Sequence, residues 1–94
     1  MTTIRSGVFD ISFSNLSDEE FQEIEIDDDI SELRANYNLI KNIDTRHLPN
    51  RLTKLYLSNN LISSIEKVRF PSGLKDLSLA GNLISSIENV NLPA

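Results

Sequence analysis

An eleven-residue pattern recurs at a constant interval along this chain, beginning at Ile30, Leu52 and Leu74. Residues 52–62 read LTKLYLSNNLI, and residues 74–84 read LKDLSLAGNLI. A looser copy, ISELRANYNLI, occupies residues 30–40. The pattern that the copies share is L-x-x-L-x-L-x-x-N-x-I. A short, fixed period of this kind indicates stacked units, each of which buries its apolar side chains only against its neighbours.

The centre of each copy alternates apolar and polar residues, which predicts a half-buried strand. Equal turns stacked on one another would place each strand leucine beside its counterpart, for example Leu55 beside Leu77. Strands placed in this way would pair in parallel. So short a turn leaves little room for a helix, and we expect extended or 3₁₀ returns between the strands.

The repeated pattern resembles that of the leucine-rich repeat family, strongly over residues 30–93 and weakly before residue 30. The resemblance implies a fold of the α/β class: a right-handed solenoid with four parallel strands and loop or 3₁₀ returns. The 22-residue turn with N-x-I-x-x-I is similar to the short, intracellular type of repeat. By the same resemblance Asn38, Asn60 and Asn82 would form a stacked ladder, with their side-chain amides bonded to the backbone of each bend.

The chain divides at the first clear copy of the pattern. Residues 1–29 are interpreted as an N-terminal segment with a degenerate capping repeat, and residues 30–94 as three regular repeats without a C-terminal cap. Laid on the 22-residue period, Val8 falls on Ile30. Residues 17–20, SDEE, have the form of a capping box and predict a short helical turn on the outer side of the first repeat.

One position in the predicted apolar column is small. Ala35 stands where the later copies have Leu57 and Leu79. Phe13 falls on Ala35 in the 22-residue period, and Tyr37 follows shortly after it. We therefore expect Phe13 or Tyr37 to fill the gap that the alanine leaves.

Composition excludes several classes of partner and cofactor. A net charge of -5 argues against binding the phosphate backbone of a nucleic acid, which needs clustered Lys and Arg. The chain has no cysteine, which removes disulfides and thiolate metal sites. No apolar run approaches the ~20 residues that span a bilayer, and the first residues do not resemble a secretory signal. We expect a cytoplasmic protein without a nucleic-acid or membrane partner.

The sequence predicts neither an enzyme nor a cofactor or metal site. It contains no P-loop, Rossmann, HExxH or G-x-S-x-G motif. His47 is the only histidine, and the spacing implies no catalytic partner for it. The three acids at residues 27–29 suggest calcium, but they lack the glycine and terminal glutamate of an EF-hand loop, and a solvated turn is the preferred interpretation.

The strands expose polar residues on the face where this family most often binds proteins. Tyr56 at its centre, flanked by Arg34 and Lys54, has the composition of an interface hot spot. The alternative is that charged residues only pair across neighbouring strands, which contributes little energy. The predicted partner-binding residues of this concave face are Glu32, Arg34, Asn36, Tyr37, Lys54, Tyr56, Ser58, Asp76 and Ser78.

Two further apolar features of the sequence could contact another protein or a second copy of the chain. Leu39, Leu61 and Leu83 follow the asparagines and form a column, which we expect the next turn to bury by half. The last repeat has no cap in this sequence, so its apolar edge could pair with a second copy. The residues predicted for such self-association are Leu77, Leu79, Ile84 and Ile87.

The sequence therefore leaves three functions open. The first is a non-catalytic protein-interaction module that binds through the concave face. The second is a capping or self-assembly unit that forms a homo-oligomer through its last repeat. The third is a fragment of the repeat domain of a larger receptor or kinase.

Overall fold

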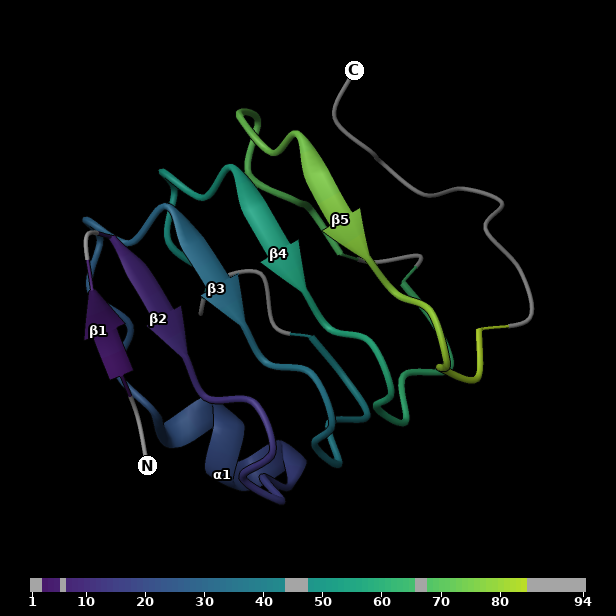
Figure 1. The fold of residues 1–94 in the computed structure, drawn as a ribbon. Coiled ribbons are helices and arrows are strands. Elements are labelled where there is room, and N and C mark those ends of the chain that lie inside the picture. Colours follow the sequence, from purple (N-terminus) through teal and green to yellow (C-terminus); the bar gives the residue numbers. More distant parts are fainter. Residues whose placement is uncertain (1–2, 6, 44–47, 66–67, 85–94) are drawn as a thin grey trace.

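The computed structural model describes residues 3–5, 7–43, 48–65 and 68–84. Within this part of the chain, one sheet of five strands runs in the order β1-β2-β3-β4-β5. Figure 1 shows the strands side by side, with one short helix beside the carboxyl end of β2. The elements are β1 (Thr3–Arg5), β2 (Val8–Asp10), α1 (Asp18–Glu23), β3 (Glu32–Arg34), β4 (Lys54–Tyr56) and β5 (Asp76–Ser78).

The four strands β2 to β5 pair in parallel, as the sequence predicts. Leu33 lies beside Leu55, and Leu55 lies beside Leu77. The pairing continues past each strand, because the Ala35 amide donates to the Tyr56 carbonyl over 2.8 Å. The predicted parallel sheet and its leucine register are therefore confirmed for the regular repeats.

The edge strand β1 was not expected from the sequence. It runs antiparallel to β2, with Ile4 opposite Phe9. Gly7, at φ 82°, lies between the two strands in a conformation that favours glycine. The Gly7 carbonyl accepts hydrogen bonds from the amides of Ser31 at 2.9 Å and Glu32 at 3.1 Å, so it also joins this edge to β3. A strand as short as β1 cannot show a periodic pattern in the sequence.

The first turn is longer than the 22-residue period of the later ones. Phe9 pairs with Leu33, whereas Leu33 pairs with Leu55, so the first interval exceeds the second by two positions. Val8 accordingly lies opposite Glu32 rather than Ile30, and the alignment on the shorter period is wrong here. The helix α1 explains the difference, because a helix advances about 1.5 Å per residue and a strand about 3.3 Å.

The helix α1 begins as its sequence predicts. The Ser17 side chain accepts from the Glu20 amide at 3.2 Å, and the Glu20 carboxylate accepts from the Ser17 amide at 3.0 Å. This reciprocal pair is the capping box. Phe21, in the middle of the helix, is fully buried and anchors it on the core.

The described residues share one apolar core. Its strand positions are Phe9, Leu33 and Leu55, and the strand-end positions are Ile11, Ala35 and Leu57. Ala35 is fully buried, yet Phe13 is 74% exposed and Tyr37 is 50% exposed. The expectation that one of these aromatic rings fills the space beside Ala35 is therefore wrong.

The asparagines join neighbouring turns. The side-chain amide of Asn60 donates to the carbonyl of Leu57 at 3.1 Å in its own turn and to that of Ala35 at 3.0 Å in the previous turn. Its Oδ1 atom accepts from the Ile40 amide at 3.2 Å. Asn38 and Asn82 each donate across two turns in the same way. The buried backbone groups of each bend are thus satisfied by a side chain from within.

Replacing the Asn60 amide by a carboxylate tests this role. We expect Asn60→Asp to lower the free energy of unfolding by about 3 kcal/mol or more, because it removes both donors and places a charge against two buried carbonyls. Asn59→Asp makes the same chemical change at the adjacent, exposed position and should cost less than about 0.5 kcal/mol. Urea unfolding followed by circular dichroism measures both. Equal losses for the two variants would contradict the role of Asn60.

A pair of leucine truncations tests the apolar column. Leu55→Ala, at a fully buried position, should lower the free energy of unfolding by about 2–5 kcal/mol through lost burial and a cavity. Leu83→Ala removes the same atoms from a side chain that is 62% exposed, and little change is expected. The same unfolding measurement compares them, and a small effect at Leu55 would count against the shared core.

Candidate protein-binding site

The outward side chains of the parallel strands form one polar surface, which we call the strand face. Within β3, β4 and β5 the central leucines point inward, and the residues on either side point outward. Glu32, Lys54 and Asp76 form one row across the sheet. Arg34, Tyr56 and Ser78 form a second row.

The structure brings together the residues proposed as a hot spot. Arg34 lies directly opposite Tyr56 on the neighbouring strand, and Lys54 lies on the same strand and the same face as Tyr56. Tyr56 is half-buried, whereas Lys54 and Arg34 are exposed. A partly buried aromatic ring with exposed cations at its rim can supply both apolar contact and hydrogen bonds to a partner.

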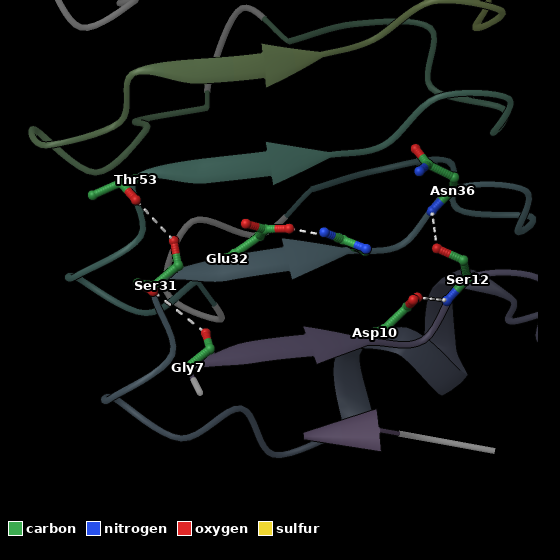
Figure 2. A network of polar contacts seen from close by, with 8 residues as sticks. Gly7, Asp10, Ser12, Ser31, Glu32, Asn36 and Thr53 are labelled. Atoms are coloured by element: carbon green, nitrogen blue, oxygen red, sulfur yellow. Dashed lines mark hydrogen bonds and ion pairs between the residues drawn. The ribbon is translucent and has the colours of Figure 1, made fainter. Parts of the chain in front are cut away.

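The ion pair on the strand face runs along one strand. The Arg34 guanidinium donates to the Glu32 carboxylate within β3 (Figure 2). This hydrogen bond and the charge of Glu32 raise the pKa of Arg34, and the charge of Asp10 adds to the effect. Among the residues that the structure describes, no ion pair joins Lys54 to Glu32 or Asp76. Lys54 therefore keeps its ammonium group available.

Several polar residues where the strands end are occupied with holding the turns together. Figure 2 shows Asp10 accepting from the Ser12 amide at 3.0 Å, and Ser12 Oγ accepting from the Asn36 amide at 3.1 Å. Asn36 Oδ1 in turn accepts from the Ser58 amide at 2.8 Å. Asn36 and Ser58, both predicted to bind a partner, thus have structural contacts of their own.

A stacked aromatic pair borders the strand face, and only half of it was predicted. The rings of Phe13 and Tyr37 lie with their centroids 4.6 Å apart and an angle of 10° between their planes. The sequence predicts Tyr37 as a partner-binding residue, but the 22-residue period places Phe13 in the column of Ala35. Lengthening the first turn, so that Phe9 falls on Leu33 as it does in the structure, would have placed Phe13 on Tyr37.

Charge is divided unevenly along the chain. Residues 7–33 contain ten Asp and Glu residues and no Lys or Arg. Residues 34–94 contain eight Lys and Arg residues and four Asp and Glu residues. The net charge of -5 does not show this uneven distribution of acidic and basic residues. The first turn, which contains β2 and α1, is consequently acidic, although the edge strand β1 beside it ends in Arg5. This division of charge was visible in the sequence.

A hollow of about 470 Å³ lies within the acidic region. Phe9, Ile26 and Ile30 line it together with Glu25, Asp27 and Asp28. Asp29 does not line this hollow. Its amide donates to Asp27 Oδ1, and its carboxylate lies 3.6 Å from Arg51 Nη1. Within the described ranges, no three acidic or histidine side chains are arranged to hold a metal ion.

The structure describes three of the four residues that the sequence predicts for self-association. Leu77, Leu79 and Ile84 are half-buried, and Ile87, like His47, lies outside the described residues. No helix in the described part of the chain is long and apolar enough to cross a membrane.

The leucines that follow the asparagines are exposed to different degrees. Leu39 is 46% exposed, which agrees with the expected half-burial, whereas Leu83 is 62% exposed and the turn that would cover it lies outside the described residues. Leu61, between them, is half-buried as expected.

Asp18 connects α1 with the following turn. Its carboxylate accepts from the amides of Lys41 at 2.7 Å and Asn42 at 2.8 Å, and from the Asn42 side chain at 2.9 Å. Partial burial alone would raise the pKa of Asp18, but the hydrogen bonds from Asn42 and Lys41 outweigh it and lower the pKa. The charged form is therefore favoured by folding.

The lowered pKa of Asp18 predicts how stability depends on pH. The contribution of Asp18 is complete above its ordinary pKa of 3.8 and is lost as the pH falls through the lower value of the folded chain. Asp18→Asn should cost about 1 kcal/mol at pH 7, and this difference should shrink below about pH 4. Thermal unfolding between pH 2 and pH 7 measures it. Glu19→Gln, at an exposed position, serves as the control, and a difference that grows on acidification would refute the assignment.

Comparisons with known proteins agree with the repeat pattern. A family model described as leucine rich repeat matches residues 50–92. Comparison with curated proteins and with solved structures found no match.

Proposed function

We propose, because a leucine-rich repeat model matches residues 50–92, that the chain is a non-catalytic module that binds a protein partner through the strand face around Tyr56. The family is generally a protein-interaction fold without catalytic activity. In this proposal the strand face is the concave side of a short right-handed solenoid. The module acts in the cytoplasm and takes neither nucleic acid nor membrane as its partner.

The observation that carries the proposal is the position of Arg34 opposite Tyr56. Tyrosine and arginine contribute more binding energy at interfaces than most residues. Tyr56 is already half-buried, so it loses little side-chain entropy on binding. Lys54 adds a cation without an intramolecular ion pair in the described structure. Asn36 and Ser58 contribute less in this proposal, because they already hold adjacent turns together.

A second candidate function is self-association through β5. Leu77 and Leu79 are only half-buried, whereas Leu55 and Leu57, their counterparts in the preceding turn, are fully buried. A second copy that covers Leu77 and Leu79 would remove this apolar surface from water. In this second function the binding partner is another copy of the same chain.

Affinity capture with the purified chain as bait tests the strand face. Proteins that bind through this face should be recovered at least about tenfold less with Tyr56→Ala or Arg34→Ala, because hot-spot truncations cost about 2 kcal/mol or more. Asn50→Ala changes an exposed position outside the strands and serves as the matched control. Quantitative mass spectrometry compares recoveries, and thermal melts verify that each variant is folded.

The molar mass in solution separates the two candidates. A monomer by light scattering, together with proteins lost specifically in the Tyr56 and Arg34 variants, supports the strand face. A dimer that Leu79→Asp dissociates supports self-association instead. The strand-face proposal fails if no captured protein depends on Tyr56 or Arg34.

A further inference from the structure

We propose that the stacked pair Phe13 and Tyr37 is a docking platform for an arginine side chain in a basic segment of a partner protein. The inference rests on the proposed function in that it also requires a protein partner. It adds a second contact, next to the acidic first turn and beyond the row of Arg34 and Tyr56. It also assigns the chemical character of the segment that binds there.

The backbone at both aromatic residues is strained. Phe13 has φ 58° and Tyr37 has φ 57°, in the left-handed region that bulky side chains rarely adopt. The equivalent positions of the next two turns are occupied by Asn59 at φ 58° and Gly81 at φ 71°. Asparagine and glycine are the residues that tolerate this conformation best. The aromatic residues thus depart from the residue types that suit this bend.

The scaffold does not need the aromatic rings to form this bend. The Phe13 amide donates to the Asn36 carbonyl at 3.0 Å, and the Tyr37 amide donates to the Ser58 carbonyl at 2.9 Å. The Asn59 amide makes the same bond at 2.8 Å with a different side chain. Backbone bonds therefore hold the bend in all three turns. Strain that the fold does not require is a feature of functional sites.

Burial does not account for the rings either. Phe13 is 74% exposed and Tyr37 is 50% exposed, so neither ring contributes much to the core. The main contact of the two rings is with each other, because they stack in nearly parallel planes. Tyr37 covers one face of the Phe13 ring and leaves the other face of Phe13 to solvent. An open aromatic face of this kind suits a flat group that stacks on it.

Charge selects the group that fits this face. Phe13 lies in the part of the chain, residues 7–33, that contains ten acids and no base. Asp10 lies three residues before Phe13 on the same turn, and one of its oxygens accepts from the Ser12 amide. The cation of Arg34 is neutralised by Glu32. A planar guanidinium stacks on an aromatic face and pairs with carboxylates at the same time, so a basic segment with arginine is the complementary partner.

Peptide titration followed by nuclear magnetic resonance tests the platform. The probe is a blocked peptide of alternating glycine and arginine, compared with the same peptide built from lysine or from citrulline, which is flat but neutral. We expect the arginine peptide to bind most tightly and to shift the ring resonances of Phe13 and Tyr37. Phe13→Asn and Tyr37→Asn should each weaken its binding by about three- to tenfold.

The asparagine variants also separate binding from folding. Because they imitate the natural Asn59, their melting temperatures should equal or exceed that of the unchanged chain, even as they lose the peptide. Leu83→Asn, which removes an exposed apolar side chain from another turn, should leave peptide binding unchanged. Loss of binding together with a higher melting temperature would be the signature of a functional, strained position.

Other outcomes would overturn the platform. Equal binding of the citrulline peptide would exclude a role for charge, and equal binding of the lysine peptide would exclude stacking of a guanidinium group. Resonance shifts confined to residues 23–29 would show a diffuse acidic surface without the rings. If no peptide binds while Tyr56→Ala still abolishes capture of partner proteins, the platform is wrong and the strand-face proposal stands.

Discussion

The structure depends on hydrogen bonds from buried asparagine amides to the carbonyls of two successive turns. Each parallel strand is too short to hold a turn in place by strand pairing alone. The chain then bends sharply and directs carbonyls into the core, where an unpaired group costs about 1–3 kcal/mol. Asn60 bonds to both Ala35 and Leu57, so it satisfies its own bend and fastens it to the preceding one. The stacking of leucines follows from this attachment.

That attachment divides the residues of each turn into two groups. The inward positions are fixed by packing and by the amides, so Leu55 and Asn60 have little freedom to change. The outward positions carry no such constraint, and recognition can be assigned to them without loss of the fold. Asn36 shows that the division is incomplete, because its side chain lies on the face and still accepts from the next turn.

The regular repeats could be predicted from the sequence, and the first turn could not. Leu55 beside Leu77 follows directly from a constant 22-residue period. The pairing of Phe9 with Leu33 does not follow from that period. A helix covers less distance per residue than a strand, so the turn that contains α1 needs more residues. The same shift concealed the stacking of Phe13 on Tyr37. Ser17 and Glu20 predicted the helix, but a capping box says nothing about how many residues the whole turn needs.

The bend after each strand offers a direct comparison between folding and function within one molecule. Four successive turns present a left-handed residue there: Phe13, Tyr37, Asn59 and Gly81. Gly81, at φ 71°, has the conformation that glycine tolerates best, and a Cβ atom there would also lie 2.3 Å from the side-chain Oδ1 atom of Asn59 in the preceding turn. Toward the acidic first turn, asparagine and glycine, which suit this backbone conformation, give way to aromatic residues. Folding alone would favour asparagine or glycine in every turn, and this contrast is the reason we propose a binding role for the aromatic pair.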